Sequence, residues 1–297
     1  MTPRVSIGLP VYNGERYLAK ALDSILAQNL GDFELIISDN ASRDATQDIC
    51  ESYAQRDRRV AYWRLAENLG AARNYNRVVD MSKGELFKWA AHDDLLRPSF
   101  LTRCVEIFDS SEVPPALVHP RADFIDDEGR VIRPDNDRMA AGSELSWVRA
   151  FQVLQAMNMM AAIGGVFHKE TLRQTRRIGS FVGSDYVLML EASLLGKIVQ
   201  LDGEPLFQRR FHESSSREAN RTTEDVLRWF DPNARMTMSP RKKIYLEYLR
   251  STVRLPGLNP VERALCAAMV VGGVSLKRAR VAVGKYRRRL ASSATAD

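Results

Sequence analysis

The sequence predicts an α/β protein whose sheet is mainly parallel. Four short apolar runs begin 26 to 28 residues apart within the first hundred residues, and each has the length of a buried strand: Val5–Leu9, Phe33–Ser38, Val60–Leu65 and Leu86–Ala90. Helical patterns of apolar residues lie between these runs. Strands that alternate with helices at this spacing imply right-handed crossovers, so we expect the four strands to be parallel.

The first helix of this pattern is the clearest. Its apolar residues recur at the spacing of a single helix face, as in Tyr17, Leu18, Ala21, Leu22, Ile25 and Leu26. Such an apolar stripe is typical of a helix that packs on one side of a sheet.

The middle of the chain has a less regular pattern. Ala116–His119 predicts a further strand, and Asp126–Gly129 predicts the turn of a hairpin. Trp147–Leu154 has helical spacing, and Ser184 is the expected N-cap of another apolar helix. We expect a loop over the polar stretch Ser214–Glu224.

The chain is expected to form two units. Residues 1–217 would be the α/β domain, whose two halves are 1–110 and 111–217, and residues 218–297 would be a basic helical appendage. Residues 241–297 contain thirteen Lys or Arg against three acids, although the whole chain has a net charge of only +6. Attraction to an anionic surface would therefore be a property of the C-terminal tail.

The cysteine content argues against a disulfide framework or a structural zinc site. Cys50, Cys104 and Cys266 lie far apart and form no C-x-x-C pair. No signal peptide is readable before the first strand, so we expect a reducing, cytoplasmic location.

Polar clusters follow all four predicted strands. In an open parallel sheet, ligands bind at the carboxyl ends of the strands. The clusters there are Tyr12–Glu15, Asp39–Ser42, Glu67–Asn68 and His92–Asp94. Four polar strand ends at one edge predict a ligand site more strongly than any single cluster would.

The adjacent carboxylates Asp93 and Asp94 predict a cation. Mg²⁺ and Mn²⁺ prefer carboxylate oxygens and often share them with substrate phosphates. The alternative is that both acids only cap the helix that follows. The chain has no G-x-G-x-x-G after its first strand and no P-loop, which disfavours a dinucleotide oxidoreductase or a P-loop enzyme. A divalent cation and Arg73 could bind phosphates instead, although Arg73 could equally be a surface residue.

Four segments resemble the nucleotide-binding half of the family two glycosyltransferases, which have the GT-A fold. They are VSIGLPVYNGERYLAKALDSILAQ, ELIISDNASRDAT, ENLGAARNYN and WAAHDDLLRP, in the family's order and spacing, over about residues 3 to 100. The resemblance implies a nucleotide-sugar donor, most commonly a UDP-sugar.

The resemblance also implies a role for each matching residue. The implied donor-binding residues are Pro10, Val11 and Tyr12 around the nucleobase and ribose, Glu15 nearby, Asp39 on the base, Arg73 near the base or phosphates, and Asp93 facing the ribose or sugar. Asp94 would bind the Mn²⁺ or Mg²⁺ that bridges the diphosphate. His92 stands where the family often has another Asp or a small residue, so one acid of the fuller D-x-D pattern is missing.

Two later segments resemble the family less closely. FVGSDYVLMLEASLLGK resembles the segment that carries the catalytic base, so Asp185 would take the proton from the acceptor hydroxyl, although Ser184 departs from the usual Glu. Asp185 could instead only stabilise the first turn of its helix, whose dipole is expected to keep it ionised. LFQRRFHESSSR resembles the segment in which His212, helped by Arg209 or Arg210, would complete the metal or pyrophosphate site.

The C-terminal tail contains an apolar stretch, Ala264–Val274, that is too short to cross a bilayer. Because Arg263 and Lys277 flank it, the stretch could lie on the anionic inner face of a membrane. It could equally be a helix packed on the domain with a solvated basic side. The basic run Lys285–Arg289 holds one aromatic residue and no known motif, so nucleic acid is not an expected partner.

These features together predict an inverting, metal-dependent glycosyltransferase. The acceptor would be a hydroxyl of a cell-envelope glycan or glycolipid, or of another lipid-linked acceptor. One alternative is a non-catalytic nucleotide-sugar-binding or scaffold protein. Another is a sugar nucleotidyltransferase, which is disfavoured because PVYNGE stands where such enzymes carry a Gly-rich, Lys-bearing loop.

Overall fold

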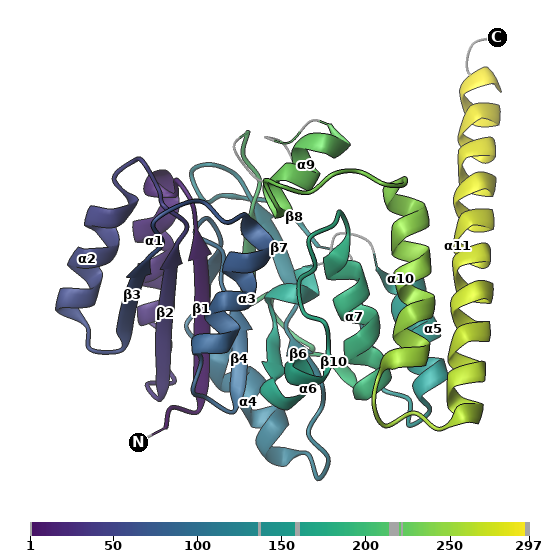
Figure 1. The fold of residues 1–297 in the computed structure, drawn as a ribbon, viewed down its shortest axis with the longest axis horizontal. Coiled ribbons are helices and arrows are strands. Elements are labelled where there is room, and N and C mark those ends of the chain that lie inside the picture. The colour runs from purple at the N-terminus through teal and green to yellow at the C-terminus, as the bar shows by residue number, and fades with distance from the viewer. Residues whose placement is uncertain (1, 136–137, 158–160, 214–219, 221, 295–297) are drawn as a thin grey trace.

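A computed structural model describes residues 2–135, 138–157, 161–213, 220 and 222–294 (Figure 1). The larger of two sheets has seven strands in the order β10-β6-β9-β4-β1-β2-β3. They are β10 (Ile198–Gln200), β6 (Leu117–His119), β9 (Val166–His168), β4 (Leu86–Trp89), β1 (Val5–Val11), β2 (Phe33–Asp39) and β3 (Val60–Arg64). The pairs β4–β1, β1–β2 and β2–β3 are all parallel, which confirms the predicted arrangement of the first four strands.

The smaller sheet has the order β5-β11-β7-β8. Its strands are β5 (Leu95–Leu96), β11 (Phe207–Arg210), β7 (Ala122–Ile125) and β8 (Val131–Pro134). The antiparallel pair β7–β8 is the predicted hairpin, and Gly129 turns it with a φ of 90° that favours glycine. Strand β5 begins directly after Asp94, and β11 ends two residues before His212. Because β5 and β11 pair antiparallel, Asp94 and His212 lie at the same end of this sheet.

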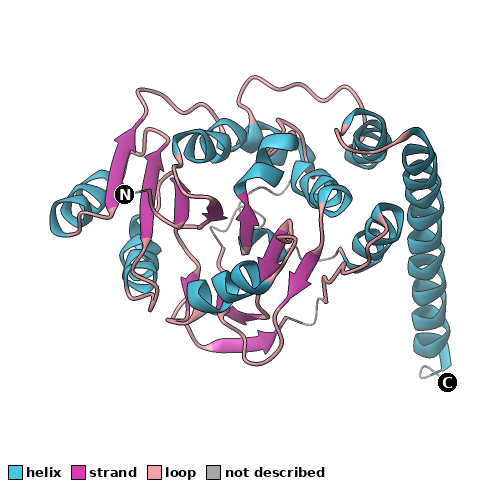
Figure 2. Ribbon diagram, turned by 90° about the horizontal axis from the view of Figure 1, so that it is seen from below, coloured by secondary structure: helices cyan, strands magenta, loops and turns pink. Residues whose placement is uncertain are grey.

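Helices cover both faces of the larger sheet (Figure 2). They are α1 (Glu15–Leu26), α2 (Thr46–Arg56), α3 (Ala71–Met81), α4 (Phe100–Ser110), α5 (Ser146–Ala156), the 3₁₀ turn η1 (Ala161–Gly164), α6 (Lys169–Gln174), α7 (Ser184–Leu195), α9 (Thr223–Phe230), α10 (Pro240–Arg254) and α11 (Pro260–Ala294). The expected N-cap at Ser184 was one residue late: Ser184 is the first residue of α7, and Gly183 precedes it in the left-handed conformation. The expected loop Ser214–Glu224 lies partly outside the described residues, and α9 begins within it.

Two apolar cores lie on opposite faces of the larger sheet. Alternate residues of β1, including Ile7 and Leu9, pack with α1 and α4 in one core. The other core joins Val187 of α7 to Tyr248 of α10 and Val270 of α11. The C-terminal helices therefore share a core with the helix that carries Asp185. The predicted division of the chain at residue 217 stays a prediction.

Candidate active site

A cavity of about 830 Å³ lies at the carboxyl ends of β1, β2 and β4. Sheet register creates this edge, because Val11 pairs with Asp39 and the amide of Asn40 donates to the carbonyl of Val11 at 2.9 Å. The cavity is lined by residues from the strand-end loops, from α3 and η1, from the end of β11 and from α9.

Side chains tie the strand-end loops to one another. The amide of Asn13 donates to Ser42 Oγ at 2.9 Å, which joins the loops after β1 and β2. Asn40 Nδ2 donates to Asn68 Oδ1 at 2.8 Å, and Asn40 Oδ1 accepts from the amide of Leu69 at 2.9 Å. These bonds join the loops after β2 and β3 and fix the shape of the cavity floor.

Pro10, Val11 and Tyr12 line the cavity, where the sequence predicts the nucleobase and ribose. Tyr12 is 40% exposed, so its ring is available to a ligand. Bases stack readily on such aromatic faces.

Asp39 lies beneath the cavity wall. Its side chain is fully buried, Oδ1 accepts from the amide of Ser42 at 2.8 Å, and Oδ2 accepts from Tyr62 Oη at 2.9 Å. Arg64 Nε lies 3.4 Å from Oδ2. The carboxylate thus already holds the loop after β2, and its predicted contact with a base stays a prediction.

Glu15 and Arg73 are not among the described residues that line the cavity. Glu15 Oε2 accepts from the amide of Ala45 at 2.9 Å, which holds the start of α1 against the loop before α2. Arg73 lies on the exposed side of α3. The structure therefore brings Pro10, Val11 and Tyr12 together with the acidic pair in one cavity. Glu15 and Arg73 lie outside it.

Asp93 and Asp94 line the cavity together with His212. Asp93 Oδ2 lies 2.9 Å from His212 Nε2, and Asp94 Oδ1 accepts from the amide of Arg210 at 2.9 Å. Arg210 Nε also donates to the carbonyl of Asp93 at 2.9 Å. The buried Arg210 therefore holds Asp94 through its amide and Asp93 through its guanidinium, which also donates to the main-chain carbonyls of Asp126 and Asp127.

The two carboxyls differ in pKa. Burial alone would raise the pKa of Asp93, but the hydrogen bond from His212 and the nearby His92 lower it below its ordinary value. Burial and the charge of Asp93 raise the pKa of Asp94 to about 7. The site thus contains one ionised carboxylate beside a second one that strongly favours a cation, because a cation offsets both causes of the raised pKa.

The donor groups fit a divalent ion that is shared with a substrate. Within the described part of the chain, no group of three or more His, Cys, Asp or Glu residues could hold a metal alone. Asp94 offers an oxygen ligand. His212 Nδ1 is buried and has no hydrogen-bond partner among the residues that the structure describes. Mg²⁺ and Mn²⁺ commonly bind through one or two carboxylates and complete their shell with phosphate oxygens and water.

Asp185 lies in the first turn of α7, directly after Ser184. Burial raises the pKa of Asp185 above its ordinary value, and the amides of Tyr186 and Asp185 itself reduce this rise without cancelling it. The expectation that Asp185 is ionised at neutral pH stays a prediction, since the ordinary pKa of an Asp is 3.8. Asp185 is not among the described residues that line the cavity, but it interacts electrostatically with Tyr75 and Arg209, which do line it.

The sequence did not indicate the wall that α9 contributes. Asp225, Arg228 and Trp229 line the cavity, and the Trp229 and Tyr75 rings lie 6.4 Å apart with their planes at 64°. The amphipathic run Val226–Phe230 was the available signal, but it follows directly on the stretch that was expected to be a loop.

A buried lysine beneath the site was also missed. Lys88 of β4 is 1% exposed, and its Nζ donates to the carbonyl of Trp89 at 2.9 Å. Nζ also lies 4.8 Å and 5.4 Å from the ring centres of Phe100 and Phe207. Burial lowers the pKa of Lys88 to about 8, although the charge of Asp94 opposes this shift. A single Lys within the apolar run LFKWA was its only signal.

The fold defines an α/β protein of the GT-A type, with a small second sheet beside the carboxyl edge of the larger one. A family model described as glycosyl transferase family 2 matches residues 6–164, which is more than half of the chain. The chain therefore belongs to glycosyl transferase family 2.

Several relatives are similar to this chain. An uncharacterised glycosyltransferase of Rickettsia typhi is 33% identical over 137 residues, which are 45% of this chain and 42% of that protein. An uncharacterised glycosyltransferase of a Nostoc species is 27% identical over 221 residues, covering 72% of this chain and 66% of the relative. The matched region is less than half the length of the Rickettsia typhi relative.

Solved structures share the fold at low sequence identity. Residues 1–349 of S. aureus TarS superpose with a TM-score of 0.65 and 16% identity, over 92% of this chain and 71% of that one. The same TarS region in complex with UDP-GlcNAc superposes with a TM-score of 0.66, over 92% of this chain and 72% of that one. The mannosyltransferase PcManGT of Pyrobaculum calidifontis, in complex with GDP-Man and Mn²⁺, superposes with a TM-score of 0.54 and 16% identity. The match covers 96% of this chain and 80% of that one. In the described residues of the present chain, no helix has the length and apolarity needed to cross a membrane.

Proposed function

We propose that this chain transfers a sugar, with inversion, from a nucleoside diphosphate donor to a hydroxyl acceptor. The observation that carries the proposal is the acidic pair Asp93–Asp94 at the carboxyl edge of the sheet, in one cavity with Pro10, Val11 and Tyr12. A UDP-sugar is the favoured donor, because the similar TarS structure was solved with UDP-GlcNAc.

Asp94, with Asp93 and His212 beside it, is proposed to hold Mn²⁺ or Mg²⁺. When bound, such an ion supplies positive charge to the leaving diphosphate. Arg209 lines the same cavity and would add a second positive group near that charge. Asp93 would then face the ribose or the sugar, while Tyr12 would pack on the nucleobase.

Asp185 is proposed to be the base. Its carboxylate would take the proton of the acceptor hydroxyl as that oxygen bonds to the anomeric carbon. The bond from this carbon to the phosphate oxygen breaks in the same step, and the nucleoside diphosphate leaves with the electron pair. The raised pKa of Asp185 suits this role, because a stronger base removes a hydroxyl proton more readily.

The acceptor is proposed to belong to a cell-envelope glycan or glycolipid at the inner face of a membrane. The outward side of α11 is apolar, with Val261, Val271 and Leu276 at 67%, 46% and 39% exposure. Between Glu262 and Asp297 the sequence holds eight Lys or Arg and no acid. An apolar helix face followed by cationic turns suits an anionic bilayer surface.

Vesicle sedimentation tests this membrane contact. The protein should sediment with phosphatidylcholine vesicles that contain phosphatidylserine, and about 0.5 M salt should release most of it because exposed charges are then screened. Equal sedimentation with pure phosphatidylcholine vesicles would contradict the electrostatic part of the proposal. Failure to sediment with either vesicle would reject membrane contact.

Calorimetric titration with UDP, GDP and dTDP, each with and without Mn²⁺, tests the donor site. One nucleotide is expected to bind, and more tightly when the metal is present. If the folded protein binds none of the three, the strand-end carboxylates are not a donor site, and the scaffold alternative gains support.

A further inference from the structure

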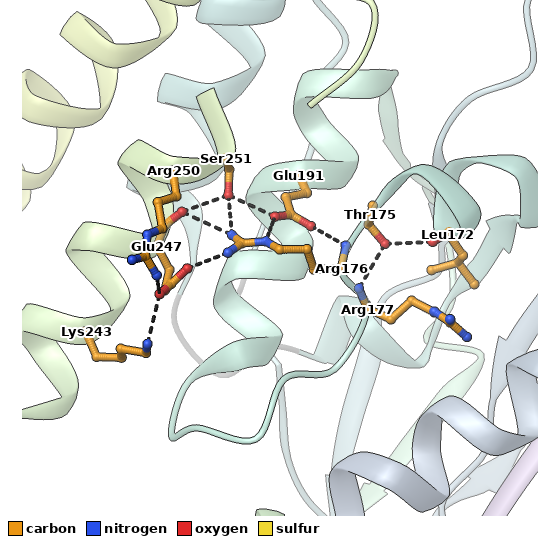
Figure 3. A network of polar contacts seen from close by, with 9 residues as sticks. All are labelled: Leu172, Thr175, Arg176, Arg177, Glu191, Lys243, Glu247, Arg250 and Ser251. Carbon is orange, nitrogen blue, oxygen red and sulfur yellow. Dashed lines mark hydrogen bonds and ion pairs between the residues drawn. The ribbon is translucent and has the colours of Figure 1, made fainter. Parts of the chain in front are cut away.

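The helix that carries Asp185 also carries a buried carboxylate that the proposed chemistry does not use. Glu191 of α7 is 1% exposed, six residues after Asp185. A buried carboxylate is costly unless it is paired and hydrogen-bonded. Its partner is Arg176, whose Nε donates to Glu191 Oε1 at 2.6 Å and whose amide donates to Oε2 at 2.8 Å (Figure 3).

Arg176 binds α10 with the rest of its guanidinium group. Nη1 donates to Glu247 Oε2, while Nη2 donates to the Glu247 carbonyl at 3.1 Å and to Ser251 Oγ at 2.7 Å. Ser251 Oγ in turn lies 2.9 Å from Glu191 Oε1, which closes the network. We call these four residues, Arg176, Glu191, Glu247 and Ser251, the arginine clamp. The clamp joins α7 to α10 through groups that, Arg176 apart, are almost fully buried.

Helix α10 also contacts the first turn of α7 directly. A side chain on Gly183 would place its Cβ 2.4 Å from Ile244 Cδ1, so α10 packs against the bare backbone there. Gly183 has a φ of 85°, a second reason for glycine at this position. Tyr248, one turn further along α10, is buried, and Asp185 contributes to its raised pKa. Helix α10 is therefore in contact with the backbone that orients Asp185.

The loop of residues 175–183, which contains Arg176, is bound on its other side by α3. Asn76 Nδ2 donates to the Ile178 carbonyl at 2.8 Å, and the Ile178 amide donates to Asn76 Oδ1 at 3.1 Å. Arg177, with a φ of 57° that is uncommon outside glycine, forms an ion pair with Asp80. Since Tyr75 of α3 lines the cavity, this loop connects the donor side of the site to the base-bearing helix.

We propose that the arginine clamp is a positioning device that sets the distance of the Asp185 carboxylate from the bound donor. Arg176 holds α7 at Glu191 and α10 at Glu247, while α10 supports the turn before Asp185. The residues of the clamp touch no substrate and act only through Asp185. The proposal rests on the base role proposed above for Asp185.

Arg176→Lys tests the clamp, because lysine keeps the charge but lacks the planar five-donor group that binds Glu191, Glu247 and Ser251 at once. Nucleotide release is followed with the sugar donor of whichever nucleotide binds in the titration, water serving as acceptor. We expect kcat to fall by about 10- to 100-fold, since small misplacements of a reacting group have effects of this size. The KM for donor and the Kd for nucleotide should change by less than about twofold, because this variant leaves the strand-end loops intact.

Hydrogen exchange gives a readout that does not depend on turnover. Arg176→Lys should speed exchange over residues 181–190 and leave exchange in β1 and β2 unchanged. Arg173→Lys is the matched control, because the one ion pair of Arg173 within the described part of the chain is an exposed pair with Glu170 on α6. Ser251→Ala removes a smaller part of the clamp, and it replaces Arg176→Lys if that variant folds poorly.

The outcomes separate the clamp from the proposed function. Unchanged kcat and unchanged exchange over 181–190 would overturn the clamp proposal, as would a loss of nucleotide affinity equal to the loss of kcat. If Asp185→Asn instead keeps the parental turnover, the base assignment fails, whatever Arg176→Lys does. Loss of turnover in Asp185→Asn but not in Arg176→Lys rejects the clamp alone.

Discussion

The strand-end edge of the cavity and the packed helices α7 and α10 hold their carboxylates in different ways. The two helices, here called the wall, add no residue to the described lining of the cavity. At the edge, sheet register and short loops place Asp93 and Asp94, and the Arg210 main chain and guanidinium bind them directly. On the wall, Asp185 lies on a helix that Arg176 joins to α10 through hydrogen bonds to Glu191 and to Glu247, which lies 71 residues after Arg176 in the sequence. The proposed donor site therefore consists of strand-end loops that β11 supports through Arg210 and His212, whereas placement of the proposed base depends on the packing of helices.

The two regions also differ electrostatically. The carboxyls at the edge influence each other, with the pKa of Asp93 lowered and that of Asp94 raised to about 7. Asp185 stands apart from any ion pair among the described residues, and burial is the main cause of its raised pKa. The edge is therefore suited to binding positive charge, and the wall to accepting a proton.

Asp185→Asn is expected to have the largest effect on turnover. The amide keeps the shape of the side chain but cannot accept the acceptor proton, so kcat should fall by about 10²- to 10⁴-fold. Nucleotide affinity, a property of the edge, should stay within about twofold. Steady-state kinetics measures the fall in kcat, and calorimetry on the same preparation measures the nucleotide affinity. Parental turnover in Asp185→Asn would show that Asp185 is not the base. The edge and the wall would then no longer differ in function as proposed.

Lys88→Met is expected to have a smaller effect, on stability under alkaline conditions. The pKa of Lys88 is about 8 in the folded protein and near 10.5 when the chain is unfolded, so the unfolded state binds more protons between these values. The contribution of Lys88 to the free energy of unfolding should therefore rise with pH from 8 to 10.5, by roughly 3 kcal/mol in total.

Urea unfolding of the parental protein and of Lys88→Met across this pH range measures that contribution. The difference in unfolding free energy between the two proteins should shift in favour of the parental protein as pH rises. A difference that stays constant from pH 8 to 10.5 would show that the amine is not buried beneath the edge.

The sequence was sufficient to predict the strand-end loops of the edge because each loop directly follows its own strand. Strand periodicity and the polar residues that follow each strand predicted four parallel strands and brought Tyr12, Asp93 and Asp94 to one edge. The same local information did not show that the Asp39 carboxylate accepts hydrogen bonds from Ser42 and Tyr62, because Tyr62 comes from the neighbouring strand.

The wall could not be predicted in the same way. Arg176, Glu191 and Glu247 are ordinary charged residues in the sequence, and they form a network only when α7 and α10 pack together. Burial by other elements is likewise the largest cause of the raised pKa of Asp185, and a place in the first helical turn does not show how deeply a side chain is buried. Tertiary packing, which has no local signal, decided both.

The most direct test of this account is a titration of UDP with Mn²⁺ into three proteins: the parental chain, Asp94→Ala and Arg176→Lys. Loss of the Asp94 ligand should weaken metal-dependent binding by about 100-fold, in line with the several kcal/mol that a metal contributes at such sites. Arg176→Lys should bind as the parental chain does, because its effect is confined to the wall. Parental affinity in Asp94→Ala would contradict the central claim that the strand-end carboxylates bind the donor through a cation.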